Sequence, residues 1–250
     1  RGLTLIIVPD FTADTIIGRA NAHRATLLYA SPFHIRLLSG AGRSAFTTLK
    51  RVISTSAGLA PAVNNTFKEK YQLPVIQAYG IIEIGLPLIN LDEANSQPEF
   101  VGKALPDYEV VILDDKNQPL ASNESGNLAI KGPGLFSAYL QPFIKAEEVL
   151  KNGYFLTGDY ASKDESGLVT IKGRLKSMIN VAGNKVFPEE IESVLQKHPC
   201  VELAKAEKEA HPILGEIVKA SIVSRDNKGC SEDELIEFCK EHLSSFKIPR

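Results

Sequence analysis

The chain has 250 residues, of which 44% are hydrophobic and 23% charged, a composition typical of a globular protein with a packed core. Its formal net charge of −2 argues against partners that bind mainly through opposite charge, such as nucleic acid or an anionic membrane. We therefore expect a small-molecule partner and one large or two ordinary domains.

The cysteines and histidines show no spacing typical of a metal site or a nucleophile with its base. Because the three cysteines are odd in number, a disulfide framework is not expected, and a reducing compartment fits best. No apolar run approaches the roughly 20 residues of a membrane-spanning helix, and the amino end lacks a signal-peptide pattern. We expect a soluble, cytoplasmic protein in which these residues are structural: Cys200, Cys230, Cys239, His23, His34, His198, His211 and His242.

The first part of the chain alternates short apolar runs with segments of helical periodicity. Strands are predicted over 3–9, 26–31, 51–57 and 74–79, and helices over 12–25, after Ser31 and Pro32, and over 62–71. Strands that alternate with helices usually pair in parallel through right-handed crossovers. The pattern predicts an α/β part over residues 1–97.

Two further parts are predicted by changes in this pattern. Residues 98–173 contain strands and turns, with strands over 108–114 and 127–132 and a hairpin that reverses at 164–167, so they form a β-rich subdomain. Residues 174–250 form a small α+β domain with helices over 188–198 and 232–246, the second opened by a capping box of Ser231 and Glu234, and strands over 201–207 and 216–224.

Two strand ends of the α/β part carry candidate binding sequences, 54-STSAGLAP-61 and 77-QAYGIIEIG-85. Ligand crevices of open parallel sheets lie at the carboxyl ends of the strands. There Tyr79 offers a stacking face and Gly80 removes a side chain. Glu83 is a carboxylate among isoleucines, where an unpaired charge is costly and a metal ion would neutralise it.

A second candidate site is formed by 157-TGD-159 and by Arg174 and Lys176, which follow it across the hairpin. A carboxylate only accepts hydrogen bonds and a guanidinium only donates them, so Asp159 and Arg174 can hold one ligand that offers both kinds of group.

Four motifs in this order, 79-YGIIE-83, 157-TGD-159, 173-GRLKSMI-179 and 183-GNKVFPEEIE-192, resemble the adenylate-forming (ANL) superfamily of acyl- and aryl-CoA synthetases, luciferases and peptide-synthetase adenylation domains. Its patterns read YGxTE, TGD, GRxK and GxxVxPxEIE, and the similarity covers essentially the whole chain. The resemblance implies that ATP and a carboxylic acid form an acyl-adenylate and pyrophosphate, after which a thiol, usually that of coenzyme A, takes the acyl group.

The resemblance also implies roles for residues of both candidate sites. Asp159 would accept hydrogen bonds from the ribose hydroxyls, and Arg174 would hold the same ribose from the other side. Tyr79 would stack on adenine, and Glu83 would bind Mg²⁺, which takes oxygen ligands and neutralises phosphate charge. The other residues expected to contact the nucleotide are Ser56, Ala57, Gly58, Gly80 and Ile82.

Two more roles concern the second half-reaction. Lys176 matches the hinge about which the small C-terminal domain swings, and Gly183 matches a loop that lines the thiol tunnel. Apolar neighbours of the site suggest an apolar acyl or aryl tail: Ala78, Ile81, Leu86 and Pro87.

The chain departs from the superfamily pattern in three ways. Ile82 stands where Thr is usual, so a hydroxyl that would donate to the α-phosphate is absent. The phosphate loop that should precede this segment, and the catalytic lysine that should follow 246-FKIPR-250, are also missing. We therefore expect an internal part of a longer synthetase, inactive on its own.

Other interpretations remain open at this point. The chain could belong to an adenylation domain that loads a carrier protein, or to a non-catalytic module that keeps adenosine binding, which Ile82 favours. Locally, Tyr79 could be a core aromatic, Asp159 a turn residue, and Arg174 and Lys176 a solvated charge pair. The acids Glu189, Glu190 and Glu192 are explained by the helix dipole.

Overall fold

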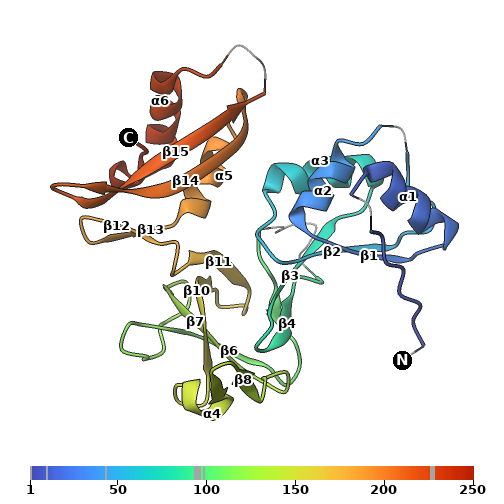
Figure 1. Cartoon of the computed structure of the whole chain (residues 1–250), viewed down its shortest axis with the longest axis horizontal. Helices are drawn as coiled ribbons and strands as arrows, with labels where there is room; N and C mark the ends of the chain where they lie inside the picture. The colour runs from blue at the N-terminus through green and yellow to red at the C-terminus, as the bar shows by residue number, and fades with distance from the viewer. Residues whose placement is uncertain (1, 10, 43, 93–96, 98, 226–228) are drawn as a thin grey trace.

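The computed structural model describes residues 2–9, 11–42, 44–92, 97, 99–225 and 229–250. In this part of the chain the strands form a five-stranded sheet, two four-stranded sheets and one small two-stranded sheet. We refer to the three larger ones as the first, second and third sheet, in chain order. Figure 1 shows them in three parts, and the predicted α/β class is confirmed.

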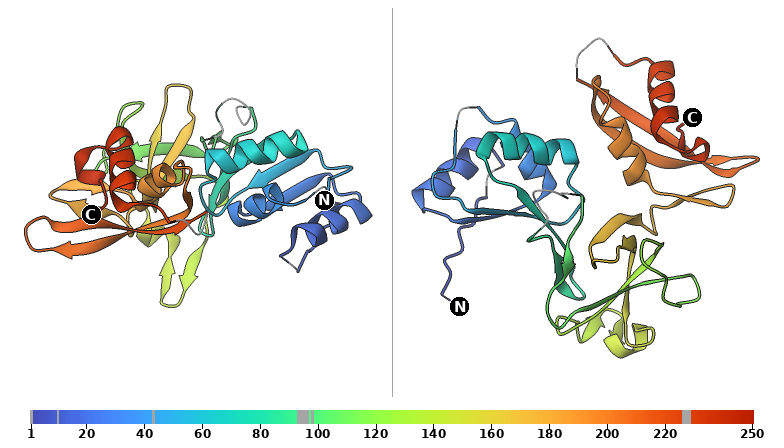
Figure 2. Two further views of the ribbon diagram at one scale, coloured as in Figure 1. Left: turned by 90° about the horizontal axis from the view of Figure 1, so that it is seen from above. Right: turned by 180° about the vertical axis from the view of Figure 1, so that it is seen from behind.

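The first sheet has the order β1-β2-β3-β4-β5, with β1 to β3 parallel and β4 and β5 antiparallel. Its three helices lie on one side of β1 and β2, as the views in Figures 1 and 2 agree. The elements are β1 (Leu27–Ala30), β2 (Arg51–Ser54), β3 (Val75–Ile81), β4 (Gly85–Ile89), β5 (Lys103–Ala104), α1 (Ala13–Ala22), α2 (Pro32–Ser39) and α3 (Pro61–Tyr71).

The first residues of each helix explain where it begins. Thr12 caps α1 by accepting a hydrogen bond from the Thr15 backbone N–H at 3.2 Å. Proline stands at the first position of α2 and of α3, where its missing N–H costs nothing. Their apolar faces pack on β2 and β3 in a cluster that includes Ile16, Ile17, Ile35, Leu38, Val52, Phe67 and Val75.

The strand predicted over residues 3–9 is wrong, because the residues described there have no regular secondary structure. Leu3, Leu5 and Ile7 are 90%, 83% and 75% exposed. An alternating apolar pattern forms a strand only when a neighbouring strand satisfies its backbone groups, and the described part of the chain supplies none here.

The second sheet is antiparallel, with the order β11-β10-β7-β6, and its core extends into the first sheet. Ile112, Leu128 and Ile130 pack in one buried cluster with Leu88 of the first sheet and with Ile84 in the turn between β3 and β4. The elements are β6 (Glu109–Leu113), β7 (Ser125–Lys131), β10 (Phe155–Lys163) and β11 (Val169–Arg174), with β8 (Ala138–Leu140), β9 (Phe143–Lys145) and α4 (Ala146–Val149) beside them.

The third sheet, with the order β13-β12-β15-β14, is covered by two helices, and we call this unit the C-terminal lobe. Helix α5 begins with Pro188, as predicted, and buries Ile191 and Leu195. The elements are β12 (Ile179–Val181), β13 (Asn184–Val186), α5 (Pro188–Leu195), β14 (Val201–His211), β15 (Gly215–Ser224), α6 (Glu232–His242) and the 3-10 helix η1 (Ser245–Lys247).

Two predictions for the C-terminal lobe are wrong. Cys200 and Cys230 form a disulfide, although the odd cysteine count argued against one; the third cysteine, Cys239, is a buried free thiol. The capping box of Ser231 and Glu234 does not form, because the Ser231 side chain makes no capping hydrogen bond. The Glu234 carboxylate lies instead 3.6 Å from Nε2 of His198. In both cases the partner of the side chain is distant in the sequence and is set by tertiary packing.

Among the described residues, no helix is long and apolar enough to cross a membrane.

Candidate functional site

Asp159 is positioned by an irregularity in β10. Gly158 has φ +78°, a left-handed conformation that suits glycine, and the pairing register with β7 shifts between Leu156 and Tyr160. The Asp159 backbone N–H donates to Thr157 Oγ1 at 3.1 Å, and that hydroxyl donates to the Leu128 carbonyl at 3.0 Å. The bulge therefore fixes where the carboxylate points.

Asp159 and Arg174 are paired directly across the hairpin. They are cross-strand partners in the register of β10 and β11, and Arg174 Nε lies 2.9 Å from Asp159 Oδ1. The carboxylate is only 3% exposed, whereas the guanidinium side chain is 62% exposed. The pair thus joins a buried acceptor to a donor whose side chain is largely exposed.

The second carboxylate oxygen of Asp159 is held by Tyr79, 80 residues earlier in the chain. The Tyr79 hydroxyl donates to Asp159 Oδ2 at 2.5 Å. Burial, with the nearby charge of Asp159, raises the pKa of Tyr79 well above its usual value, so the phenol remains a donor at neutral pH. Since a carboxylate offers about four lone-pair sites, roughly two remain for a ligand.

The Tyr79 ring belongs to the buried cluster shared by the first and second sheets and is 9% exposed. The surroundings of Tyr79 in the structure are those of a core aromatic residue, one of the two interpretations of the sequence. Its predicted stacking on adenine stays a prediction.

The loop of residues 55–59 lies at the same end of the first sheet as Tyr79. Strands β2 and β3 are parallel neighbours, with Ser54 opposite Gln77, and Gln77 Oε1 accepts the Leu59 backbone N–H at 3.0 Å. Ser56, at φ +81°, is exposed in this loop with Ala57 and Gly58. The parallel topology therefore brings the two candidate sequences of the α/β part to one edge.

The turn between β3 and β4 carries Gly80, Ile82 and Glu83. A Cβ on Gly80 would lie 2.4 Å from the Gly85 carbonyl oxygen, so only glycine fits without a backbone shift. The Ile82 side chain is 98% exposed. An aliphatic side chain offers no hydrogen-bond donor, so Ile82 presents only apolar surface to solvent here.

Glu83 is oriented by the β8–β9 hairpin. The Tyr139 hydroxyl donates to Glu83 Oε1 at 3.1 Å, and the Phe136 backbone N–H donates to the Glu83 carbonyl at 2.7 Å. Burial, and then the hydrogen bond to Glu83, raise the pKa of Tyr139. No sequence pattern pointed to Tyr139, because it lies 56 residues from Glu83.

Mg²⁺ is commonly bound in proteins by one or two carboxylates together with substrate phosphates and water. In the described part of the chain no three His, Cys, Asp or Glu residues converge as a metal site. One ordered carboxylate at Glu83 therefore fits a magnesium ion whose other ligands come from a bound phosphate group, and does not fit an all-protein metal site.

Lys176 and Gly183 lie in the turns that lead into and through the third sheet. Lys176 is exposed two residues after Arg174, and the backbone N–H of Leu175, between them, donates to the Gly158 carbonyl at 3.0 Å. Gly183, at φ +89°, donates its N–H to Asn180 Oδ1 at 2.8 Å in the β12–β13 turn. No contact described for either residue reaches Asp159, and their predicted roles stay predictions.

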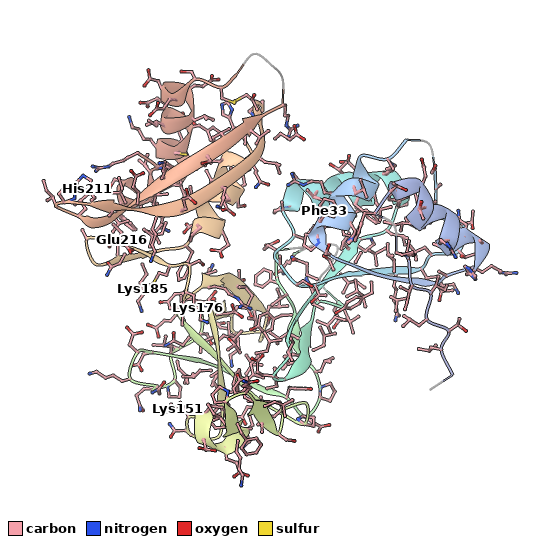
Figure 3. The ribbon with its side chains drawn as sticks, in the orientation of Figure 1. Phe33, Lys151, Lys176, Lys185, His211 and Glu216 are labelled. Atoms are coloured by element: carbon pink, nitrogen blue, oxygen red, sulfur yellow. A yellow bond between two sulfur atoms is a disulfide. The ribbon has the colours of Figure 1, made fainter. Side chains whose placement is uncertain are left out.

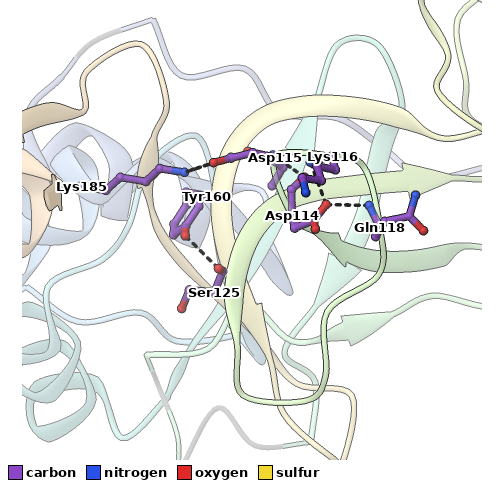
Figure 4. A network of polar contacts seen from close by, with 8 residues as sticks. Asp114, Asp115, Lys116, Gln118, Ser125, Tyr160 and Lys185 are labelled. Atoms are coloured by element: carbon purple, nitrogen blue, oxygen red, sulfur yellow. Dashed lines mark hydrogen bonds and ion pairs between the residues drawn. The ribbon is translucent and has the colours of Figure 1, made fainter. Parts of the chain in front are cut away.

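The C-terminal lobe is held to the second sheet by a contact of Lys185. Its ammonium group lies 3.0 Å from Asp115 Oδ1, in the β6–β7 turn, and 5.3 Å from the centre of the Tyr160 ring (Figure 4). Figure 3 shows Lys185 beside Lys176, at the junction of the two units. Tyr160 also stacks on Phe187, with ring centres 5.0 Å apart. These contacts fix one orientation of the lobe.

Substitution of Lys185 by methionine is expected to loosen this junction without unfolding the chain. Exposed ion pairs contribute up to about 1 kcal/mol, so trypsin should cleave after Lys176 up to about fivefold faster in Lys185→Met. Mass spectrometry of timed digests measures this rate. Lys205→Met is the matched control, because the Lys205 partner, Glu207 at 3.1 Å, lies on the same strand. Equal acceleration in both variants would contradict the expectation.

Comparison with known proteins supports a nucleotide-related family. Residues 1–140 match the family described as AMP-binding enzyme, and residues 190–250 match the AMP-binding enzyme C-terminal domain. The chain is 32% identical over 208 residues to an oxalate–CoA ligase of Saccharomyces cerevisiae, covering 82% of this chain and 38% of that protein. It is 34% identical over 200 residues to a long-chain-fatty-acid–CoA ligase of Salmonella typhimurium, covering 78% and 36%.

The fold is similar to solved structures of the same kind. ATP-bound MatB from Rhodopseudomonas palustris superposes with a TM-score of 0.90 at 29% sequence identity, covering 98% of this chain and 49% of that one. The chain thus spans about half or less of the length of these relatives and neighbours.

Proposed function

The chain belongs to the family of AMP-binding enzymes, and from this premise we propose that it is the adenosine-binding and hinge-bearing part of an AMP-forming acid–thiol ligase. The observation that carries the proposal is the buried Asp159 carboxylate, which Tyr79 and Arg174 hold while lone pairs remain for the two hydroxyls of a ribose.

The proposed position of the ribose differs from the one the sequence suggested. Asp159 and Arg174 are already in contact at 2.9 Å, so a sugar does not fit between these two atoms. It would instead lie against one side of the pair, accepting from the free N–H groups of Arg174 and donating to Asp159. Adenine would lie toward Tyr79 and the loop of Ser56, Ala57 and Gly58, which share one edge of the first sheet.

In the proposed first half-reaction a carboxylate oxygen of the acid attacks the α-phosphorus of ATP, and pyrophosphate leaves. The chain would contribute by holding the adenosine in place, with Gly80 and Ile82 beside the phosphates, which reduces the entropy lost in bringing the two reactants together. Glu83, oriented by Tyr139, would hold a magnesium ion, which when bound would neutralise phosphate charge.

In the proposed second half-reaction a thiol attacks the acyl carbonyl and AMP leaves. We propose that Lys176 is the hinge and that Gly183 lines the path of the thiol after the C-terminal lobe has moved. A hinge at Lys176 is supported by its exposed turn between the second and third sheets. We also propose that the chain divides into residues 1–97, 98–173 and 174–250, with this turn at the start of the third part. The first sheet extends past the first boundary, because its strand β5 lies beyond residue 97.

Coenzyme A is the proposed acceptor, since the relatives quoted above are named CoA ligases. An apolar acyl or aryl tail is proposed for the acid. The parts that bind the triphosphate and the catalytic lysine would come from the rest of a longer protein, so the 250-residue chain is expected to bind adenosine nucleotides without turnover. A cytoplasmic location is part of the same proposal.

The second candidate is a non-catalytic adenosine-binding module, and Ile82 is the observation that favours it. Carboxylate-dependent exchange of labelled pyrophosphate into ATP, measured on the full-length protein with a panel of acids, separates the two. Exchange with at least one acid supports the ligase. AMP binding without exchange for any acid supports the module.

Replacing Ile82 by threonine is expected to improve phosphate binding. A hydroxyl that donates to a charged acceptor contributes about 1.5–3 kcal/mol, so Ile82→Thr should lower the KM for ATP in the exchange assay about tenfold or more. Because Ile82 is 98% exposed, the substitution should leave the melting temperature unchanged. Ile82→Val, which keeps the branched shape without a hydroxyl, is the control. The same KM in all three proteins would argue against a phosphate contact at this position.

A further inference from the structure

The disulfide between Cys200 and Cys230 lies in the C-terminal lobe, away from the residues assigned to the nucleotide. Cys200 directly precedes β14 and Cys230 precedes α6, and the two are 30 residues apart in sequence. Both are partly exposed members of the apolar cluster of this lobe. The two sulfur atoms nevertheless have different surroundings.

Cys230 faces a cavity. About 360 Å³ of space lies between α6, β15 and the last residues of the chain, lined by apolar side chains such as Leu195, Ile222, Leu235 and Ile236. Cys230 is one of the residues described as lining it, and Cys200 is not. A small molecule that enters this cavity therefore lies against Cys230 and not against Cys200.

Cys200, in contrast, faces a histidine. His198 Nδ1 lies 3.1 Å from Cys200 Sγ, and His198 Nε2 lies 3.6 Å from Glu234 Oε1. The imidazole is buried and its ring meets the Phe238 ring edge-on, with centres 4.9 Å apart. The ring is thus fixed between a sulfur atom on one side and a carboxylate on the other. The Cys200 backbone nitrogen lies 3.4 Å from the same Nδ1. In the tautomer that carries its proton on Nδ1, the ring would donate a hydrogen bond to a thiolate at Cys200.

We propose that Cys200 and Cys230 form a thiol-exchange site at which a small-molecule thiol becomes attached to Cys230. The thiolate of the small molecule attacks Cys230 Sγ from the cavity, a new sulfur–sulfur bond forms there, and the Cys200–Cys230 bond breaks with its electron pair passing to Cys200. The Cys200 thiolate accepts a hydrogen bond from His198 Nδ1, and the Glu234 carboxylate lies beside Nε2 on the other side of the ring. A second molecule of the thiol restores free Cys230 and leaves as the symmetrical disulfide, so the electrons balance.

The third cysteine does not compete in this exchange. Cys239 also lines the cavity, but its side chain is 1% exposed and burial raises the pKa of its thiol. It therefore remains protonated, and a thiol is a far weaker nucleophile than a thiolate. The nucleophile that attacks Cys230 is therefore the thiolate of the small molecule.

Reduced glutathione is a suitable probe. The chain, oxidised until one free thiol remains, is mixed with glutathione at pH 7.5 and quenched with acid, and the products are mapped by mass spectrometry after alkylation with iodoacetamide. We expect glutathione on Cys230 and the alkyl label on Cys200. Glutathione found mainly on Cys200, or a chain that retains three free thiols after oxidation, would overturn the proposal.

The role of His198 is tested by rates. His198→Asn is expected to slow the first exchange about tenfold or more, since it removes the group that stabilises the leaving thiolate. Glu234→Gln, which changes an exposed side chain, should slow it less, and Cys239→Ala should leave it unchanged. Melting temperatures identify any loss of folding. If Glu234→Gln and His198→Asn, both folded, react as fast as the unchanged chain, the assignment of Cys200 as leaving group fails.

Discussion

Asp159→Asn is expected to lower the affinity of the chain for AMP by about 100-fold or more. The carboxylate would accept two hydrogen bonds from ribose, and each bond to a charged group contributes roughly 1.5–3 kcal/mol. Asparagine keeps the size of the side chain and one acceptor oxygen but loses the charge and presents an N–H₂ group in place of the second oxygen. Isothermal titration calorimetry of the folded chain with AMP measures the loss.

The matched control for this prediction is Asp164→Asn. Asp164 lies in the turn of the same hairpin, and its carboxylate accepts the Leu168 backbone N–H at 2.9 Å, so the substitution perturbs the hairpin without touching the candidate site. It should leave the affinity for AMP unchanged. Tyr79→Phe removes one hydrogen bond to Asp159 and should weaken binding less than Asp159→Asn. If Asp159→Asn binds AMP as tightly as the unchanged chain, Asp159 is not the ribose acceptor.

The second large effect is expected on stability. Gly102→Ala should lower the free energy of unfolding by about 3 kcal/mol or more, because overpacking and backbone strain add at this position. A Cβ on Gly102 would lie 1.9 Å from the Ile89 carbonyl carbon and 2.2 Å from the Asn90 nitrogen, both backbone atoms that no rotamer change can move. Gly102 also has φ +102° and bridges Val169 of β11. Urea unfolding followed by circular dichroism measures the change.

Gly153→Ala separates the two causes. Gly153 has φ +83°, so an alanine there meets the same kind of backbone strain, but no atom lies within 4 Å of its added Cβ. Gly153→Ala is expected to lower the free energy of unfolding by only about 1 kcal/mol. Equal costs at Gly102 and Gly153 would mean that the close approach at Gly102 relaxes on substitution. Because Gly102 joins the first sheet to the strand that carries Arg174, its loss should also weaken AMP binding.

The two sheets have to meet for the candidate site to exist. Tyr79 comes from the first sheet, whereas Asp159 and Arg174 come from the second, and Val101 and Val169 are buried in the cluster that joins them. Apolar packing between the sheets therefore places the polar groups. Substitutions in that cluster are expected to change nucleotide affinity even when they touch no polar atom.

The amino-acid sequence by itself determined the local elements and the family. Thr12 and the prolines at positions 32, 61 and 188 set where helices begin, since capping and a fixed φ act within a few residues. The alternation of apolar runs and helical segments predicted the parallel pairing that β1, β2 and β3 show. The four ordered motifs were sufficient to recognise the superfamily.

Only the tertiary structure decided which distant residues meet. The contacts of Tyr79 with Asp159, of Glu83 with Tyr139, and of Cys200 with Cys230 span 80, 56 and 30 residues. Each depends on strand register and on how sheets pack, which the pattern of a single segment does not specify. The same reason explains the two main errors. Residues 3–9 have the pattern of a strand without a partner in the described chain, and Cys200 and Cys230, 30 residues apart, are brought together by the packing of the C-terminal lobe.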